Sequence, residues 1–251
     1  MQPELEIITK EIPAKGKAYI IVRRCPPEGL DAALRRGAAQ ALSQGASLLY
    51  AASTDPEAPL EAGEKRGYQL IYEHDMLRMS RTLTEEPPRP GRLRLEPLVR
   101  EKGGTWLALY NEGFFNVPNS ATYDGNDLER VLGEACSAGF VLLDEVPVGV
   151  YELGFAEEQP EIEGVALRRD FRGRGLGREL LLELMGMLAR QGHTECWLRV
   201  ATSNRNAYTL DRSSAASDVY KRQLYRSLGF GRESVLSRWF QVVSESDLRI
   251  E

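Results

Sequence analysis

The chain has 251 residues, 42% of them hydrophobic, and its 32 Lys and Arg face 37 Asp and Glu, for a net charge of −5. This length favours one large or two smaller domains, and the weak acidic balance argues against a surface that binds nucleic acid or an anionic membrane. Three widely spaced cysteines, Cys25, Cys136 and Cys196, predict neither a disulfide framework nor a metal site. No apolar run approaches the roughly 20 residues of a membrane-spanning helix, and the N-terminal residues lack a secretion-signal pattern, so we expect a soluble, cytoplasmic protein.

Residues 1–83 predict a small α+β unit. β-branched and aromatic residues favour a strand over 17–23, an Ala- and Leu-rich segment favours a helix over 30–44, and a short apolar strand follows at 47–52. Two further strands, about 68–73 and 77–82, are expected to form a hairpin. The next segment, 84–91, has three prolines in four positions, which predicts a semi-rigid linker before a separate domain over 92–251.

The second domain reads as a mixture of strands and helices. The expected elements are a strand at 92–96, helices at 100–111 and 125–135, strands at 139–144, 148–155 and 161–167, a helix at 175–190, a strand at 196–200 and a final strand pair within 230–243. A weak internal repeat relates Arg66-Gly67-Tyr68 to Leu228-Gly229-Phe230, each ahead of an expected hairpin. The first unit is therefore either a degenerate half-copy of the second or similar to it by chance.

The most informative stretch is Arg172-Gly-Arg-Gly175-Leu-Gly177-Arg178, which connects the strand at 161–167 to the helix at 175–190. The first turn of a helix has unpaired N–H groups that favour an anion, and glycines let a phosphate approach the backbone closely. A turn without a ligand would leave three arginines beside the positive end of the helix, which is unfavourable. The order GxGxxG of a dinucleotide site and the Gly-Lys-Ser/Thr of a P-loop are both absent. The stretch therefore predicts a site for a pyrophosphate.

The motif Arg172-x-x-Gly175-x-Gly177 resembles the Gln/Arg-x-x-Gly-x-Gly/Ala signature of the GNAT N-acetyltransferases, in which this turn holds the pyrophosphate of acetyl-CoA. Downstream, Asn204-x-x-Ala207-x-x-Leu210 and Leu224-Tyr225-x-x-x-Gly229-Phe230 resemble the family's Asn-x-x-Ala-x-x-Leu-Tyr-x-x-x-Gly-Phe run. The resemblance covers about 92–243 and implies the α/β GNAT fold, a mixed and mostly antiparallel sheet flanked by helices. It also implies an N-acetyltransferase that uses acetyl-CoA as cosubstrate and a small-molecule or peptide amine as acceptor. We expect a monomer or homodimer with no metal, nucleic-acid or membrane partner.

The resemblance also implies roles for individual residues. Tyr225 matches the tyrosine that protonates the departing sulfur, although a packing tyrosine before a Gly-Phe turn is the alternative. Glu163 matches a glutamate that takes the amine proton directly or through water, and an ordinary exposed carboxylate is the other interpretation. The expected acceptor residues, in a segment that is otherwise a loop with a hydrophobic anchor, are Phe114, Phe115, Asn116 and Tyr123. The expected cofactor residues are Val165, Ala166, Leu167, Arg172, Gly173, Arg174, Gly175, Leu176, Gly177, Arg178, Asn204 and Ala207.

Residues 211–224 interrupt the family pattern. Joining Leu210 directly to Tyr225 restores it, so the segment is surplus. It is either translated adaptor sequence left in an assembled gene or a genuine insertion. A helix split at this point would favour the alternative function, a non-catalytic acyl-CoA-binding or regulatory module.

Overall fold

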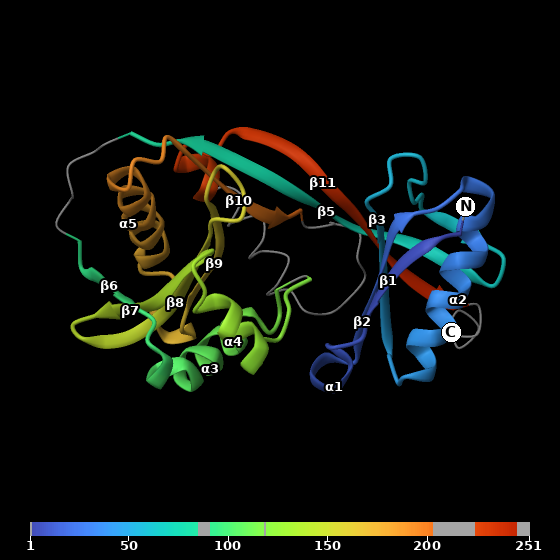
Figure 1. The fold of residues 1–251 in the computed structure, drawn as a ribbon, viewed down its shortest axis with the longest axis horizontal. Coiled ribbons are helices and arrows are strands. Elements are labelled where there is room, and N and C mark those ends of the chain that lie inside the picture. Colours follow the sequence, from blue (N-terminus) through green and yellow to red (C-terminus); the bar gives the residue numbers. More distant parts are fainter. Residues whose placement is uncertain (1, 85–90, 118, 203–223, 245–251) are drawn as a thin grey trace. The chain divides into compact units, whose positions relative to one another are not determined.

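The computed structural model describes residues 2–84, 91–117, 119–202 and 224–244 (Figure 1). The chain forms two compact units: unit 1 holds the described residues of 1–77, 201–219 and 235–251, and unit 2 those of 78–200 and 220–234. These boundaries differ from the predicted division into 1–83 and 92–251. They fall within two long strands, β5 (Tyr68–Thr82) and β11 (Arg232–Ser244), each of which contributes to both units.

Unit 1 contains β1 (Glu4–Ile8), α1 (Ile12–Lys15), β2 (Lys17–Arg24), α2 (Leu30–Ser43), β3 (Leu48–Ser53), β4 (Gly63–Lys65) and parts of β5 and β11. Its strand order is β1-β2-β3-β11-β5, with β4 paired to β5. Strands β2 and β3 are parallel, while β1–β2 and β3–β11 are antiparallel. The strands predicted at 17–23 and 47–52 and the helix predicted at 30–44 are confirmed to within one residue.

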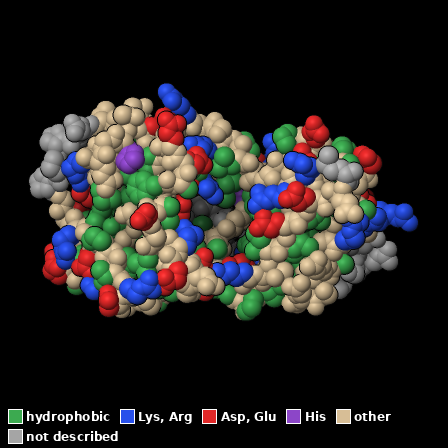
Figure 2. All heavy atoms as spheres, viewed as in Figure 1, with side chains coloured by type: hydrophobic (Ala, Val, Ile, Leu, Met, Phe, Trp, Pro, Cys, Tyr) green, Lys and Arg blue, Asp and Glu red, His purple; other side chains and the backbone are tan. Residues whose placement is uncertain are grey.

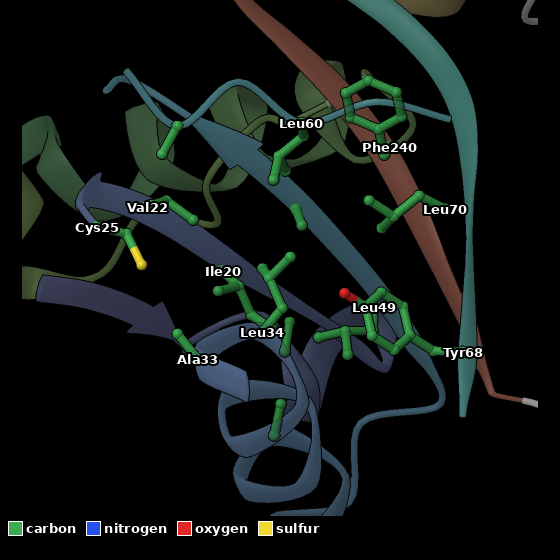
Figure 3. Close-up of a cluster of buried hydrophobic side chains, with 14 of the residues drawn as sticks. Ile20, Val22, Cys25, Ala33, Leu34, Leu49, Leu60, Tyr68, Leu70 and Phe240 are labelled. Carbon is green, nitrogen blue, oxygen red and sulfur yellow. The ribbon is translucent and has the colours of Figure 1, made fainter. Parts of the chain in front are cut away.

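The core of unit 1 lies where α2 packs on the sheet (Figure 3). Small residues of α2 recur every four positions, at Ala33, Gly37 and Ala41, and form the buried side of the helix. A Cβ on Gly37 would lie 3.1 Å from Cδ1 of Ile20, so the glycine lets the helix come close to β2. The larger side chains of this core come from the strands and the following loop and include Val22, Leu49, Leu60, Tyr68, Leu70 and Phe240.

Unit 2 contains β6 (Leu93–Pro97), α3 (Gly103–Phe114), α4 (Gly125–Val131), β7 (Cys136–Leu143), β8 (Val146–Gly154), β9 (Glu161–Leu167), α5 (Leu176–Arg190), β10 (Glu195–Ala201) and parts of β5 and β11. Its strand order is β5-β10-β9-β8-β7-β6. The pairs from β6 to β9 are antiparallel, and the β9–β10 pair is parallel, with α5 as the crossover. The expected fold class, a mixed and mostly antiparallel sheet flanked by helices, is confirmed.

The helices of unit 2 cover opposite faces of its sheet, with α3 and α4 on one side and α5 on the other (Figure 1). Along β8, Val150 belongs to the core beneath α3, together with Trp106 and Phe140. Because side chains alternate along a strand, Glu152 lies on that same face, and Leu153 faces the other side. On α5 the buried residues Leu176, Leu180, Leu184 and Leu188 repeat at helical spacing, as the sequence predicts.

Two predicted hairpins are wrong, because β5 and β11 each continue as a single strand of 15 and 13 residues. The first of these predictions placed a reversal between residues 73 and 77. The structure instead pairs two residues of that segment with β11: His74 stacks on Trp239 with ring centroids 6.4 Å apart, and Asp75 accepts from Arg238 at 3.1 Å. Without glycine or proline to reverse the chain, the strand continues.

Membrane-spanning helices and surface charge can be compared with what the sequence suggests. No helix among them is both long and apolar enough to cross a bilayer. On the face shown in Figure 2, acidic and basic side chains are interspersed, which fits the weak net charge.

Candidate active site

Strand β9 separates from β10 soon after the two strands meet. The parallel register pairs Trp197 with Glu161 and Leu198 with Ile162 and ends there, whereas β9 remains paired with β8 as far as Leu167. Within the described chain, residues 163–167 thus have a backbone edge with no strand partner on the β10 side. The predicted cofactor residues Val165, Ala166 and Leu167 lie on this edge. A backbone edge of this kind offers N–H and C=O groups to an extended ligand.

A bulge in β9 lies at the start of the same edge. Glu152 of β8 is opposite Gly164, while Leu153 is opposite Ile162, so Glu163 is the extra residue. A bulge leaves its extra residue outside the ladder and re-aims the side chain. Glu163 extends toward α4, where its Oε2 is 3.6 Å from Nη1 of Arg130.

The predicted phosphate turn follows β9 directly. A 3₁₀ turn at Arg169–Phe171 leads into residues 172–175, and α5 begins at Leu176. Gly173 and Gly175 have φ angles of +73° and +79°, which only glycine adopts without strain. Among the described residues, no side chain caps the start of α5, so no cap accepts from the N–H groups of its first turn. Arg172 braces the turn, because its Nε donates to the carbonyl of Leu167 at 2.8 Å.

Gly177 is required by neither the backbone nor the packing of the protein. It is the second residue of α5, its φ lies outside the left-handed region, and a Cβ built on it would meet no atom of the described residues within 4 Å. The described residues therefore leave the space in front of the first turn open. Arg172, Arg174 and Arg178 are exposed around it. An anion there would offset the unfavourable placement of three cations at a helix N-terminus, so the turn fits a pyrophosphate.

A buried carboxyl group stands beside Glu163. Glu152 of β8 is 0% exposed, and it accepts from Nη2 of Arg130 at 2.9 Å and from the Tyr123 hydroxyl at 3.1 Å. Arg130 also donates to the Tyr123 hydroxyl at 2.8 Å. Burial, reinforced by the charge of Glu163, raises the pKa of Glu152 to about 7. The site thus holds a buried carboxyl group that is harder to ionise than an exposed glutamate.

Two of the four expected acceptor residues come together on this face. Tyr123 stacks on Tyr110 with centroids 4.0 Å apart, and Tyr110 stacks on Phe114 at 4.4 Å. Asn111 fixes Tyr123 through hydrogen bonds of 2.9 and 2.8 Å to its backbone carbonyl and N–H. A Cβ on Gly164 would lie 3.2 Å from Tyr110 and Phe114, so a glycine there lets the stack rest on β9.

The other two expected acceptor residues are placed differently. Phe115 is 49% exposed, and Asn116 is exposed beyond the end of α3. Neither takes part in the aromatic stack.

Tyr225 lies in the helical turn that precedes Gly229 and is buried. Its ring meets Phe230 edge-on at 6.0 Å, and its carbonyl accepts from the N–H of Phe230 at 3.1 Å. Arg81 of β5 donates to the carbonyl of Leu228 and so fixes the end of this turn. The other residues expected on this helix, Asn204 and Ala207, and all but Leu224 of the segment 211–224, lie outside the described residues.

The acetyltransferase (GNAT) family matches residues 103–230, just over half of the chain. The chain belongs to this family. Members of the GNAT family are acyltransferases that use acetyl-CoA, and the open turn and the β9 edge lie within the matched residues.

Individual relatives agree with this assignment. A mycothiol acetyltransferase of Clavibacter sepedonicus is 27% identical over 205 residues, which cover 78% of this chain and 66% of the relative. A mycothiol acetyltransferase of Clavibacter michiganensis subsp. michiganensis is 27% identical over 169 residues, covering 65% of this chain and 55% of the relative. The chain therefore spans less than two thirds of the length of either relative.

Solved GNAT structures share the fold. A GCN5-related N-acetyltransferase from Sphaerobacter thermophilus superposes with a TM-score of 0.59 at 18% identity, covering 95% of this chain and 75% of that one. One from Kribbella flavida gives a TM-score of 0.52 at 15% identity, covering 91% and 81%.

Sequence reasoning missed Glu152 and Arg130. The available signal was a single charged residue in an otherwise apolar strand, since Glu152 follows Val148, Val150 and Tyr151 in a segment that reads as buried on both faces. Arg130 carried no signal of its own, because a charged residue on a short helix is ordinarily solvated. Among the described residues, no group of three or more His, Cys, Asp or Glu side chains is arranged to hold a metal ion.

Proposed function

We propose that this chain transfers the acetyl group of acetyl-CoA to a primary amine by direct attack in a ternary complex. The observation that carries the proposal is the continuity of the edge of β9, the glycine turn and the start of α5. One stretch, 163–178, offers hydrogen-bond donors along a line that ends at the glycine turn and the first turn of α5. A long cosubstrate with a thioester at one end and a pyrophosphate further along matches this arrangement.

Each end of the stretch would hold a different part of the cosubstrate. The N–H groups of the turn and of the first turn of α5 would bind the pyrophosphate, with Arg172, Arg174 and Arg178 adding charge. The edge formed by Val165 and its two successors would bind the pantetheine arm and the acetyl carbonyl. Acetyl-CoA supplies an activated acetyl group and a thiolate leaving group. N–H donors fixed at the carbonyl oxygen stabilise the negative charge that develops there.

Two side chains would handle protons. Glu163, on the bulge at the start of the edge, would take a proton from the acceptor's ammonium group. Tyr225 would donate its hydroxyl proton to the departing sulfur. Tyr123 and Phe114 would form an aromatic wall for the acceptor, with Glu152 and Arg130 behind it.

The acceptor in this proposal is a small-molecule amine. Two curated relatives carry the name mycothiol acetyltransferase, so the mycothiol precursor that lacks the acetyl group is the first compound to assay. Peptide amines form the second panel.

The proposal is tested by measuring the release of free CoA thiol. A thiol reagent follows this release in the presence of acetyl-CoA and each amine. Amine-dependent release that is lost in Tyr225→Phe, with acetyl-CoA affinity retained, supports acetyl transfer. Acetyl-CoA binding with no amine-dependent release, both in this chain and in a version lacking 211–224, favours a non-catalytic acyl-CoA-binding module.

A further inference from the structure

Two carboxyl groups face each other on the α3–α4 side of β8 and β9. Glu152 points from β8 into the core, and Glu163 extends from the β9 bulge back over Gly154 of β8. A side chain at Gly154 would collide with the carboxyl group of Glu163, so the glycine makes room for it. A hydrogen bond between the two carboxyl groups contributes to the raised pKa of Glu152.

Arg130 is the cation that touches both carboxyl groups. Its Nη2 is 2.9 Å from Glu152 Oε1, and its Nη1 is 3.6 Å from Glu163 Oε2. A further carboxylate nearby, Glu161, is paired with Arg199 at 2.8 Å. The titratable and charged groups that bear on the pair are Tyr110 from α3, Tyr123 from the loop before α4, Arg130 from α4, Cys136 from β7, and Glu161 from β9.

The net charge of Glu152, Glu163 and Arg130 taken together changes when one of the two carboxyl groups is protonated. With both carboxyl groups ionised, the two glutamates and Arg130 sum to −1, and one added proton brings the sum to zero. Glu152 is the costlier member to ionise, since it is 0% exposed while the side chain of Glu163 is 27% exposed.

We propose that Glu152 and Glu163 act as one proton-accepting pair in the acetyl transfer, with Arg130 holding the two carboxyl groups together. The inference rests on the proposed function for the role of Glu163 as base. Glu163 meets the acceptor, whereas Glu152 and Arg130 are positioning residues that act through it.

The proton balance needs no further reactant. An N–H bond of the acceptor's ammonium group breaks and its proton passes to Glu163, where Glu152 shares it. The amine nitrogen then forms a bond to the acetyl carbon, the carbon–sulfur bond breaks, and the sulfur takes the hydroxyl proton of Tyr225. The proton that the amide nitrogen loses on bond formation returns the tyrosine to its neutral state through solvent.

The test is a titration of the enzyme without substrates, following the side-chain carboxyl carbons of ¹³C-labelled glutamate by NMR. Resonances are assigned by their loss in Glu152→Gln and Glu163→Gln. In the unaltered enzyme, the Glu152 resonance should titrate at a higher pH than that of an exposed glutamate. In Glu163→Gln, the midpoint of Glu152 should fall, because the charge and hydrogen bond of Glu163 no longer raise the pKa of Glu152.

Substitution of the cation should shift the titration in the opposite direction. In Arg130→Gln the midpoint of Glu152 should rise, and Arg130→Lys, which keeps the charge, should bring it back toward its original value. A merely structural role would not move this midpoint in opposite directions in Glu163→Gln and Arg130→Gln. Arg130 is 44% exposed, so its variants carry the test if Glu152→Gln does not fold.

Glu183→Gln is the matched control, because Glu183 is an ion-paired glutamate of the same unit, 3.2 Å from Arg190 and 31% exposed. It should leave the midpoint of Glu152 unchanged. A Glu152 resonance that titrates at the same pH in the unaltered enzyme and in Glu163→Gln overturns the inference.

The pH dependence of kcat/KM links the titration to catalysis. Its acidic limb should shift to lower pH in Glu152→Gln and to higher pH in Arg130→Gln. Coupled titration in an enzyme that shows no amine-dependent thiol release would overturn the role in catalysis, together with the proposed function. Acetyl transfer without coupled titration would overturn the inference alone.

Discussion

A substitution at Gly177 should affect protein stability and acetyl-CoA binding in opposite ways. It occupies the second position of α5, and a Cβ built there would meet no atom within 4 Å in the part of the chain that the structure describes. Glutamine is a good helix former, whereas glycine costs about 1 kcal/mol in a helix. Gly177→Gln should therefore raise the free energy of unfolding by up to about 1 kcal/mol. For a chain of this length that raises Tm by about 2–4 °C.

The same substitution should weaken the binding of acetyl-CoA. Its side chain would stand in the open space before the first turn and keep the pyrophosphate away from the N–H groups there. Hydrogen bonds to a charged group contribute about 1.5–3 kcal/mol, so the loss of one raises Kd by about 10- to 100-fold. Gly177→Ala adds one methyl group, which the GNAT signature accepts at this position, and should have a smaller effect on Kd.

Gly186 provides the control within the same helix. Its Cβ would approach only the flexible end of Arg190, at 3.2 Å from Nη1. Gly186→Gln should therefore raise the free energy of unfolding by a similar amount and leave the Kd for acetyl-CoA unchanged. Thermal denaturation and calorimetry with acetyl-CoA measure both quantities. If Gly177→Gln binds acetyl-CoA as tightly as the unaltered chain, the turn is not the pyrophosphate site. Equal weakening of acetyl-CoA binding in Gly186→Gln would refute the assignment as well.

Three other perturbations have defined outcomes. Tyr225→Phe should lower kcat about 100-fold or more with Kd for acetyl-CoA unchanged, because only the proton donor is lost; an unchanged kcat would contradict the assigned role. Gly113→Val should destabilise the fold by about 1–3 kcal/mol in urea denaturation, since a Cβ there would lie 2.5 Å from Cβ of Ala166 and push α3 off β9; no loss of stability would contradict this packing. Burial lowers the pKa of His74 from 6.5 to about 4, so the unfolded chain takes up the proton first. The free energy of unfolding should therefore fall as pH drops from about 6.5 toward 4, and a His74→Phe variant with the same slope would refute this.

The strand at 161–167 and the helix at 175–190 were predictable because their signals are local. An apolar run, a glycine turn and a helical repeat of leucines each lie within a few residues of one another. The structure has β9 at Glu161–Leu167 and α5 at Leu176–Arg190, and it places Gly173 and Gly175 in the backbone conformation that the glycines suggested.

The bulge and the buried pair were not predictable, because both depend on register. Glu163 is an extra residue only because Glu152 pairs with Gly164 while Leu153 pairs with Ile162. Glu152 in turn is buried only because Arg130 and Tyr123, 22 and 29 residues earlier, reach it from α4 and the preceding loop.

The predictions for the long strands β5 and β11 were wrong for a similar reason, because residues far apart in the sequence decide the outcome. Polar residues in the middle of a strand suggest a turn when read alone. In the fold, His74 and Asp75 are buried or paired by Trp239 and Arg238 of the other strand, so no turn is needed.

The central claim is that the turn at 172–178 and the edge of β9 bind acetyl-CoA. Calorimetry with acetyl-CoA tests it most directly, on this chain and on a version that lacks 211–224. The account predicts one-to-one binding by at least the shortened chain, weakened at least tenfold by Gly177→Gln and unaffected by Gly186→Gln. An absence of binding by both chains, with each shown to be folded, would contradict it.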